Sequence, residues 1–203
     1  MQSIEITRPD DWHLHVRDGD VLKDVVPATA ACFGLAILMP NLVPPVTDAA
    51  SAAAYRERIL AAAQGTDFRP LMTIYLTEST TREDILEARA EGVVAAKLYP
   101  AGATTNSDSG VTSIERIAST LAAMEKFDMP LLVHGEVTHS YIDVFDRETR
   151  FLDEVLTPLL NRYPNLRVVL EHISTADAAQ FVATAGDTVA ATITAHHLLF
   201  NRN

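Results

Sequence analysis

Short apolar runs of strand-like composition alternate with helical patterns along the whole chain. Alternation of this kind indicates a parallel sheet, which is either doubly wound or closed as a (β/α)8 barrel. No glycine-rich phosphate loop follows the first run, which weakens the dinucleotide-binding form of the doubly wound fold. We predict strands at residues 12–16, 35–39, 70–76, 93–99, 130–134, 167–172 and 188–194.

The intervening segments carry recognisable helix signals. The alanine-rich stretch 47–64 is a strong helix former, and Gly65 closes it. A hydroxyl residue followed three positions later by an acidic one is a typical helix start. Three pairs fit this signal: Thr81 with Asp84, Thr112 with Glu115, and Ser174 with Asp177.

Polar residues gather where the predicted strands end, which favours the barrel. Chemistry in a TIM-type barrel takes place at the carboxyl ends of its strands. The fold class we predict is therefore α/β, a (β/α)8 TIM-type barrel of which this chain covers about seven strands. No linker or repeat divides residues 1–203, so we expect one domain. The strand-end residues are His15, Arg17, Asn41, Lys97, Tyr99, His134 and His172.

The segment "DDWHLHVRDGD", residues 10–20, places three polar side chains two positions apart. On a strand His13, His15 and Arg17 would share one face, while the apolar residues between them face the other way. Two imidazoles at this spacing suggest a metal, and a guanidinium beside them suggests a bound anion. Arg17 could instead form a surface ion pair with Asp18 or Asp20.

Two further histidines end separate strands, His134 in "LLVHGE" and His172 in "VVLEHIS". A single histidine in an apolar strand is usually a satisfied core residue, but four at strand ends favour metal binding by zinc or a related ion. Lys97 in "VVAAKLYP" is different, because an ammonium group only donates hydrogen bonds. On the residues alone, Lys97 is a buried lysine paired with an unidentified carboxylate.

Other polar positions allow two interpretations. Asn41 in "LMPNLVPP" is a turn residue or a site residue. The tract 102–110, "GATTNSDSG", is a flexible loop or an active-site lid. The remaining histidines, His139, His196 and His197, are interpreted as loop or mouth residues.

Composition excludes some partners. The net charge of −11 argues against nucleic acid, because phosphate binding needs a basic surface. With Cys32 as the only cysteine, no intrachain disulfide forms, which is typical of a reducing compartment. We found neither a signal segment nor an apolar run of membrane-spanning length, so we expect a cytoplasmic protein without membrane contact.

The polar motifs, taken together, resemble a known family. Its members are the bacterial single-domain dihydroorotases of the amidohydrolase superfamily. The resemblance covers the whole chain, and the motifs fall in the family's order. They are "HLHVRD", "MPNLVPPV", "KLYPAGATTNSDSGV", "VHGEV", "LEHIST" and "TITAHHLLFNRN".

This resemblance implies a binuclear zinc site. His13 and His15 match ligands of the first ion, and His134 and His172 match ligands of the second. Lys97 matches a lysine carboxylated by CO2, whose carbamate bridges two Zn²⁺ ions. Carboxylation would turn a donor-only cation into an anion with oxygen ligands, which removes the difficulty at Lys97.

The same resemblance implies a small-molecule substrate and a reaction. Members convert N-carbamoyl-L-aspartate reversibly to L-dihydroorotate in the pyrimidine (UMP) pathway, and a homodimer is expected. Arg17 and Asn41 match residues that hold the substrate carboxylate, and Thr104 and Thr105 match a mobile loop that closes over it. Substrate contacts are also expected from His15 and His134.

One family residue has no match within residues 1–203. The general base of the family is an aspartate after the eighth strand, which we expect to lie beyond Asn203, so no catalytic residue is assigned within the chain. We therefore expect a C-terminally incomplete barrel that is poorly soluble and nearly inactive alone. Two alternatives stay open: another cyclic-amide hydrolase of the hydantoinase or allantoinase type, and a non-catalytic homologue that serves as a binding or assembly module.

Overall fold

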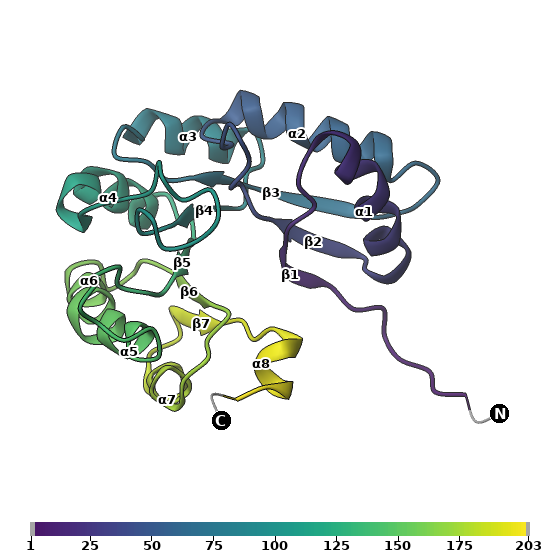
Figure 1. Ribbon diagram of the computed structural model, residues 1–203. Helices are drawn as coiled ribbons and strands as arrows, with labels where there is room; N and C mark the ends of the chain where they lie inside the picture. The colour runs from purple at the N-terminus through teal and green to yellow at the C-terminus, as the bar shows by residue number, and fades with distance from the viewer. Residues whose placement is uncertain (1–2, 202–203) are drawn as a thin grey trace.

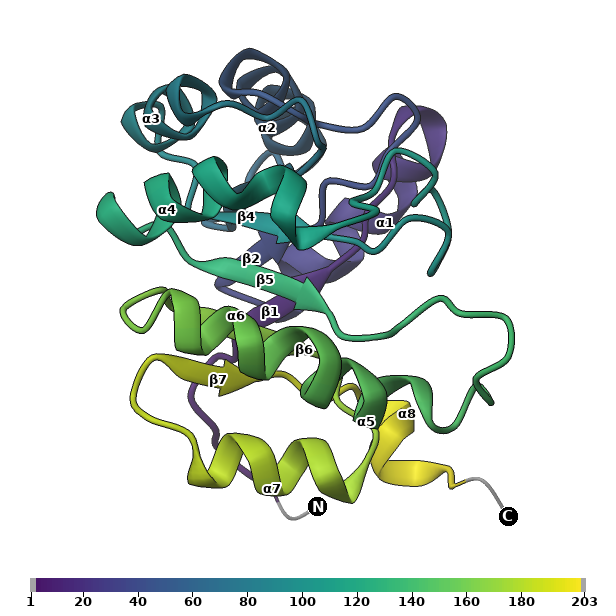
Figure 2. The same ribbon diagram turned by 90° about the vertical axis from the view of Figure 1, so that its left-hand side faces the viewer.

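A curved parallel sheet of seven strands forms the centre of the molecule, and the helices that connect one strand to the next lie on its outer side (Figures 1 and 2). The computed structural model describes residues 3–201. Neighbouring strands in the sheet are also neighbours along the chain. The strands are β1 (Asp11–Leu14), β2 (Leu35–Leu38), β3 (Arg69–Tyr75), β4 (Ala95–Leu98), β5 (Leu131–His134), β6 (Val168–Glu171) and β7 (Val189–Ala191).

Helical segments connect successive strands, as parallel pairing requires. Two of them depart from α geometry: η1 (Ile114–Ile117) is a 3-10 helix, and η2 (Leu152–Leu156) is a π-type segment between two α-helices. The α-helices are α1 (Gly19–Cys32), α2 (Ala49–Ala62), α3 (Arg82–Ala90), α4 (Ala118–Lys126), α5 (Arg147–Phe151), α6 (Thr157–Arg162), α7 (Ala176–Thr184) and α8 (Ala195–Leu199).

The predicted fold is confirmed. All seven predicted strands are present, all pair in parallel, and together they form part of a TIM-type barrel. Within residues 3–201, β1 and β7 are the two edges of the sheet and do not pair with each other. The outermost residues of the predicted domain, 1–2 and 202–203, lie outside the described range.

Two of the predicted helices are present, and the start predicted for one of them is confirmed. Thr81 and Asp84 form a reciprocal capping box at the start of α3. The alanine-rich segment is α2, where Asp48 and Ser51 form a second capping box. Gly65, three residues after this helix, has a φ of 80°, a conformation that glycine adopts without strain.

The other two helix starts were predicted wrongly by one residue. Ser113 rather than Thr112 caps η1, because the Thr112 backbone and hydroxyl donate to the Glu78 carboxylate instead. Thr175 rather than Ser174 caps α7 and accepts a hydrogen bond from Ala178 N. In both cases two adjacent hydroxyl residues compete, and tertiary contacts decide between them.

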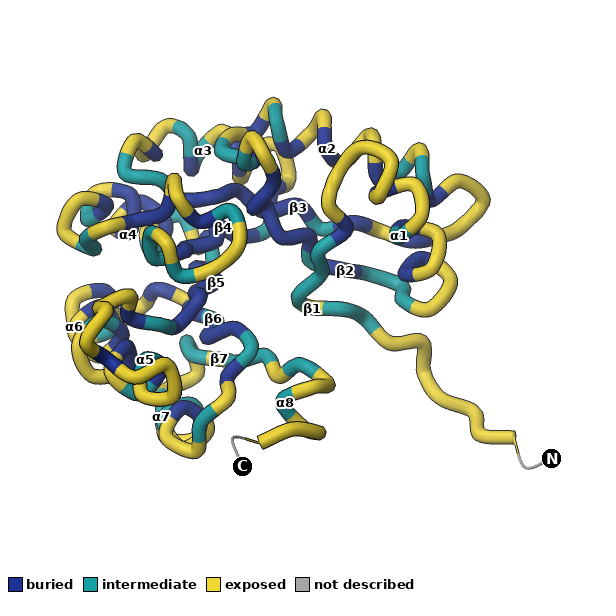
Figure 3. Tube along the Cα trace, in the orientation of Figure 1, coloured by how far each residue is buried: buried dark blue, intermediate teal, exposed yellow. Residues whose placement is uncertain are grey.

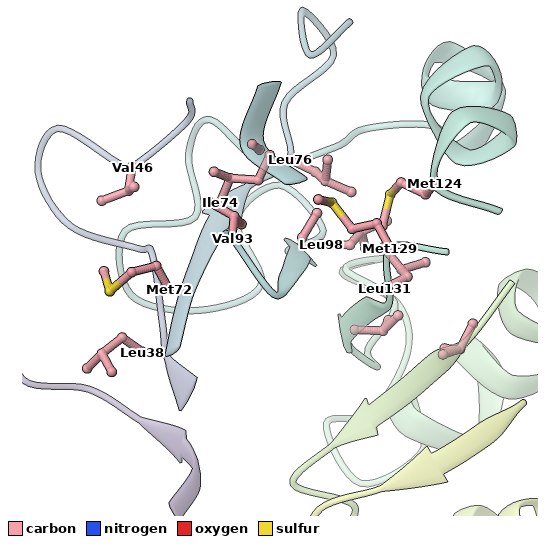
Figure 4. Packing of buried hydrophobic residues seen from close by; sticks show 14 of the residues in the cluster. Leu38, Val46, Met72, Ile74, Leu76, Val93, Leu98, Met124, Met129 and Leu131 are labelled. Carbon is pink, nitrogen blue, oxygen red and sulfur yellow. The ribbon is translucent and has the colours of Figure 1, made fainter. Parts of the chain in front are cut away.

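The sheet separates two apolar regions of unequal size. The large one fills the space between the strands and the outer helices, where Leu38, Ile74, Leu98 and Leu131 are fully buried (Figures 3 and 4). Among residues 3–201, the buried apolar cluster on the inner side consists of Met39, Ala95 and Leu132. Polar side chains therefore occupy much of the inner side.

Candidate functional site

Lys97 lies at the end of β4, where strand alternation directs it inward. Its neighbours Ala96 and Leu98 face the apolar layer under the helices. The lysine side chain has no solvent exposure, and its Nζ makes no hydrogen bond to any described residue. The Nζ lies 5.1 Å from the centre of the Tyr99 ring. An isolated buried ammonium group is costly, so this position calls for a chemical partner.

His13 and His15 lie together at the end of β1, as predicted. Their ring centres are 5.1 Å apart, and their Nε2 atoms are 3.2 Å apart. The strand was predicted to continue to Val16, and this was wrong, because β1 ends at Leu14 and Arg17 has a φ of 57°. That left-handed conformation breaks the alternation that would have kept Arg17 in line with the two histidines.

His134 and His172 bring two more imidazoles to the same place from β5 and from the residue after β6. Their ring centres are 4.8 Å apart, and the centres of His172 and His13 are 5.1 Å apart. His172 has a φ of 46°. In an extended strand it would face away from its neighbour Glu171, so the left-handed turn is what directs both side chains to the inner side.

Arg17 and Asn41 lie beside the histidine pair of β1. The Arg17 side chain is exposed and makes no ion pair with a described residue, because Asp18 pairs with Arg58 and Asp20 with Lys23. The alternative surface ion pair for Arg17 is therefore wrong. Asn41 is buried, and its Oδ1 makes no hydrogen bond of ordinary geometry although it lies close to His15.

The loop 102–110 is folded onto Asn41. The Asn41 side-chain amide donates to Thr105 O over 3.0 Å, and Asn106 Nδ2 donates to Asn41 O over 3.0 Å. The side chains of Thr104 and Thr105 are exposed. At the far end of the loop, a Cβ on Gly110 would lie 2.5 Å from Tyr99 O, so only glycine fits there.

Burial lowers the pKa of three basic groups in this cluster and so favours their neutral forms. Desolvation lowers the pKa of His15 to about 3 and that of His172 to about 2, with nearby positive groups adding to the effect. Desolvation also lowers the pKa of Lys97 to about 8, against the opposing charge of Glu171. Neutral imidazoles and a neutral amine have lone pairs available for a metal or an electrophile.

Glu171 is a site residue that sequence reasoning missed. Its carboxylate is buried, and Oε2 lies 2.5 Å from His13 Nδ1 and accepts a hydrogen bond of 2.7 Å from Thr192 Oγ1. The motif "LEHIS" contains it, but a residue next to an inward histidine is expected to face outward. The signal that could have found it was a carboxylate between the apolar run "VVL" and a histidine.

The three remaining histidines lie outside this cluster. His139 stacks on Tyr141 in the loop after β5, and His196 and His197 contact each other in α8. Within residues 3–201 no ring contact joins them to the four inner imidazoles. His139 lies in a loop, as predicted, whereas His196 and His197 lie in helix α8 and not in a loop.

The expected catalytic aspartate is the one site residue without a position in the structure. It was expected beyond Asn203, and Asn203 itself lies outside the described residues, which end at Asn201. The described residues bring two carboxylates to the inner cluster: Glu171 contacts His13, and Glu136 Oε2 lies 3.4 Å from His134 Nε2. The aspartate beyond Asn203 therefore stays a prediction.

The model of the amidohydrolase family matches residues 10–201. The chain belongs to the amidohydrolase family.

Relatives within the amidohydrolase family are similar over the whole chain. A dihydroorotase from Marinobacter nauticus is 70% identical over 203 residues, which are all of this chain and 59% of the relative. A crystal structure of dihydroorotase from Campylobacter jejuni is 39% identical with a TM-score of 0.88, over 95% of this chain and 56% of the other. Dihydroorotase from Saccharomyces cerevisiae, solved with 5-fluoroorotic acid, is 33% identical with a TM-score of 0.85, over 95% and 57%. The chain thus spans about three fifths of its curated relatives.

Amidohydrolases generally use a metal ion, and the inner cluster can be tested for fit. No group of three or more His, Cys, Asp or Glu within residues 3–201 forms a ready metal site. The four imidazoles instead lie in a row in the order His15, His13, His172 and His134, and neighbouring ring centres are 4.8–5.1 Å apart. Two nitrogens bound tetrahedrally to one zinc ion at 2.0–2.1 Å are about 3.3–3.4 Å apart. The separation of 3.2 Å between His13 Nε2 and His15 Nε2 fits, and His134 Nε2 and Lys97 Nζ are buried without hydrogen bonds.

A well-formed pocket of this amidohydrolase chain lies elsewhere. It has a volume of about 510 Å³, and Val137, Phe151 and Leu159 contribute to its lining. None of the four inner imidazoles lines it, so it is not the candidate site. No helix among residues 3–201 is both long and apolar enough to span a bilayer.

Proposed function

We propose that the protein carrying this chain is a dihydroorotase, which cyclises N-carbamoyl-L-aspartate reversibly to L-dihydroorotate in pyrimidine (UMP) biosynthesis. The observation that carries this proposal is Lys97, buried without a hydrogen-bond partner among four imidazoles. Relatives that are 60–70% identical over the chain and named dihydroorotase support it.

The residues that would hold the metal are the two histidine pairs and Lys97. We assign two Zn²⁺ per subunit, one at His13 and His15 and one at His134 and His172. The neutral Lys97 amine would add to CO2, forming an N–C bond and releasing one proton, and the carbamate would lie between the ions. When bound, the ions supply Lewis-acid polarisation of the amide carbonyl.

The chain's own polar groups would bind and orient the substrate. Arg17 has an exposed guanidinium without an ion-pair partner, which suits a bidentate contact with a carboxylate. Asn41 lies beside it, and the Thr104–Thr105 loop, which hydrogen bonds to Asn41, would close over the bound molecule. His15 and His134 would contact the substrate from the inner side of the sheet. No described residue is assigned as general base.

The main alternative is another cyclic-amide hydrolase, of the hydantoinase or allantoinase type. An uncharged cyclic amide gives Arg17 no partner, whereas dihydroorotate carries a carboxylate. The yeast relative was solved with an acidic ligand, 5-fluoroorotic acid, which favours the acidic substrate.

A paired assay of the gene product separates these alternatives. Turnover of L-dihydroorotate should greatly exceed turnover of an uncharged hydantoin at equal zinc. Replacing the charge with Arg17→Met should raise KM for dihydroorotate at least tenfold, because a charge-assisted bidentate contact contributes about 1.5–3 kcal/mol. The same variant should leave any hydantoin activity unchanged. A preference of the unmodified protein for hydantoin would overturn the proposal.

The second alternative is a non-catalytic module, which metal analysis tests. A dihydroorotase should retain about two zinc ions per chain after gentle purification, whereas a module with a degenerate site should retain none. Homodimer formation and a cytoplasmic location stay predictions. Sedimentation of the gene product and cell fractionation check them.

A further inference from the structure

A buried carboxylate links three strands on the inner side of the sheet. Glu171, the last residue of β6, is 1% exposed. Its Oε2 lies 2.5 Å from His13 Nδ1 on β1 and accepts from Thr192 Oγ1, just after β7, over 2.7 Å. The Thr192 hydroxyl oxygen in turn accepts from His172 N over 2.8 Å. The resulting chain runs from His172 through Thr192 and Glu171 to His13.

This arrangement determines which nitrogen of His13 is free. A carboxylate at Nδ1 accepts a hydrogen bond and keeps the proton on that nitrogen, so the lone pair is left on Nε2. The Nε2 atom is the one that lies 3.2 Å from His15 Nε2. Both the tautomer and the ring orientation therefore suit a metal between the two Nε2 atoms.

Thr192 restricts the position of the carboxylate. A hydroxyl group has one proton to donate, and Thr192 donates it to Glu171 while its oxygen accepts from the His172 backbone. The same hydroxyl therefore links the backbone of His172 to the carboxylate that contacts His13. Replacing it would leave the His172 N–H and a carboxylate oxygen of the buried Glu171 each without one partner.

We propose that Glu171, held by Thr192, is a positioning residue that orients His13 for metal binding. This inference rests on the part of the proposed function that places a metal at His13 and His15, and it is independent of the substrate. Glu171 does not touch substrate or metal in this role. The competing explanation is that Glu171 only balances the charge of Lys97, which would not require the contact with His13.

The first readout uses the metal-free gene product and needs no activity. ¹⁵N NMR of the imidazole nitrogens should show His13 protonated at Nδ1 and unprotonated at Nε2. In Glu171→Ala this preference should be lost. Glu171→Gln should keep part of it, because an amide oxygen still accepts from Nδ1–H while the charge is gone. The charge-balance explanation expects Glu171→Gln to be as damaging as Glu171→Ala.

The second readout is affinity for Zn²⁺, with Co²⁺ absorption as a probe of the ligand set. Loss of an outer partner of a metal ligand typically weakens binding about 10–100-fold, and we expect this range for Glu171→Ala. Thr192→Val should weaken binding less, and Thr192→Ser, which keeps the hydroxyl, should restore it. Circular dichroism checks that each variant is folded. If Glu171→Ala does not fold, Thr192→Val tests the proposal.

Thr120→Val is the matched control. The Thr120 hydroxyl is as buried as Glu171 and donates to Thr80 O over 2.6 Å, outside the site. This variant should lose stability without a change in the His13 tautomer or in zinc affinity. An unchanged tautomer in Glu171→Ala, or equal losses of affinity in Thr120→Val and Thr192→Val, would overturn the inference. Wild-type protein that binds zinc but does not turn over dihydroorotate would overturn only the proposed function.

Discussion

Lys97 is the residue whose surroundings are least suited to its ordinary charged form. It is fully buried, its Nζ has no hydrogen-bond partner, and burial lowers its pKa to about 8. If a carbamate on Lys97 bridges two ions, Lys97→Ala should weaken zinc binding by more than the 10–100-fold typical of outer partners, since a ligand to both ions is lost. Metal analysis after dialysis measures this loss, and a short-chain carboxylic acid should restore part of the metal.

The control for Lys97→Ala is Lys23→Ala. The Lys23 side chain is exposed and pairs with Asp20 on the first turn of α1. Its removal should leave the metal content unchanged. Two zinc ions per chain in Lys97→Ala would show that Lys97 is not the bridge.

Gly110 allows the loop 102–110 to approach the end of β4. A Cβ at this position would lie 2.5 Å from Tyr99 O and 2.8 Å from Ser107 O, and both are backbone atoms that cannot rotate away. Gly110→Ala should lower the free energy of unfolding by about 1–3 kcal/mol, as overpacking does. Urea denaturation checks this value. Gly186→Ala, where nothing lies within 4 Å of the added carbon, should change stability by less than about 0.5 kcal/mol.

Glu78 connects two elements, the loop after β3 and the start of η1. Its carboxylate accepts from Thr112 N over 3.0 Å, from the Thr112 hydroxyl, and from Arg116 Nη1 over 2.7 Å. These hydrogen bonds lower the pKa of Glu78 to about 2 from a usual value of 4.5. The stabilisation is therefore fully present above pH 4.5 and is lost as the pH falls through about 2.

The variant Glu78→Gln measures how much the ionised Glu78 carboxylate stabilises the fold. The difference in unfolding free energy between wild type and the variant should be largest at pH 6 and should shrink at pH 3. Glu87→Gln, on the exposed side of α3, is the control and should change the unfolding free energy only slightly at pH 6. A difference for Glu78→Gln that is constant from pH 6 to pH 3 would contradict the assignment.

At the scale of elements, the sequence predicted strands better than helix starts or strand ends. Buried parallel strands are continuous apolar runs, which the sequence displays directly. The starts of η1 and α7 were missed by one residue because Thr112 and Ser174 have tertiary partners, Glu78 and Glu148. Glu171 was missed because the left-handed turn at His172 is invisible in a pattern of alternating residues.

The histidine pairs and Lys97 could be located from sequence because strand ends in a barrel converge. Their chemistry could not, since a lysine's carboxylation leaves no mark in composition or spacing and was suggested only by the resemblance. The burial of Asn41 by the loop 102–110 was likewise unpredictable, because it depends on backbone hydrogen bonds in a segment without periodicity.

At the scale of the whole molecule, apolar side chains are exposed beside the two edge strands. Trp12 on β1 is 50% exposed, and Leu198, Leu199 and Phe200 near β7 are 72–78% exposed. Unpaired strand edges with apolar neighbours favour association. The 203-residue polypeptide should therefore self-associate as its concentration rises, which analytical ultracentrifugation measures.

A triple variant tests the cause of this association. Replacing Leu198, Leu199 and Phe200 with serine should lower both the association and the binding of an apolar dye. Tyr141→Ser removes a side chain that is equally exposed, at 81%, but lies in the loop after β5. It should leave association unchanged. Equal effects of the two variants would mean that the edges are not responsible.

The sequential order of the strands bears on how the chain folds during synthesis. Each strand from β2 to β7 pairs with one already made, so every βα unit can dock as it leaves the ribosome. The contact between His13 and Glu171 is the exception, because it joins residues 158 positions apart. His13 and His15 therefore stay exposed during synthesis until the first six strands have formed. If this pair binds a metal as proposed, capture should be a late event, because a chain stalled before β6 has the two histidines without Glu171.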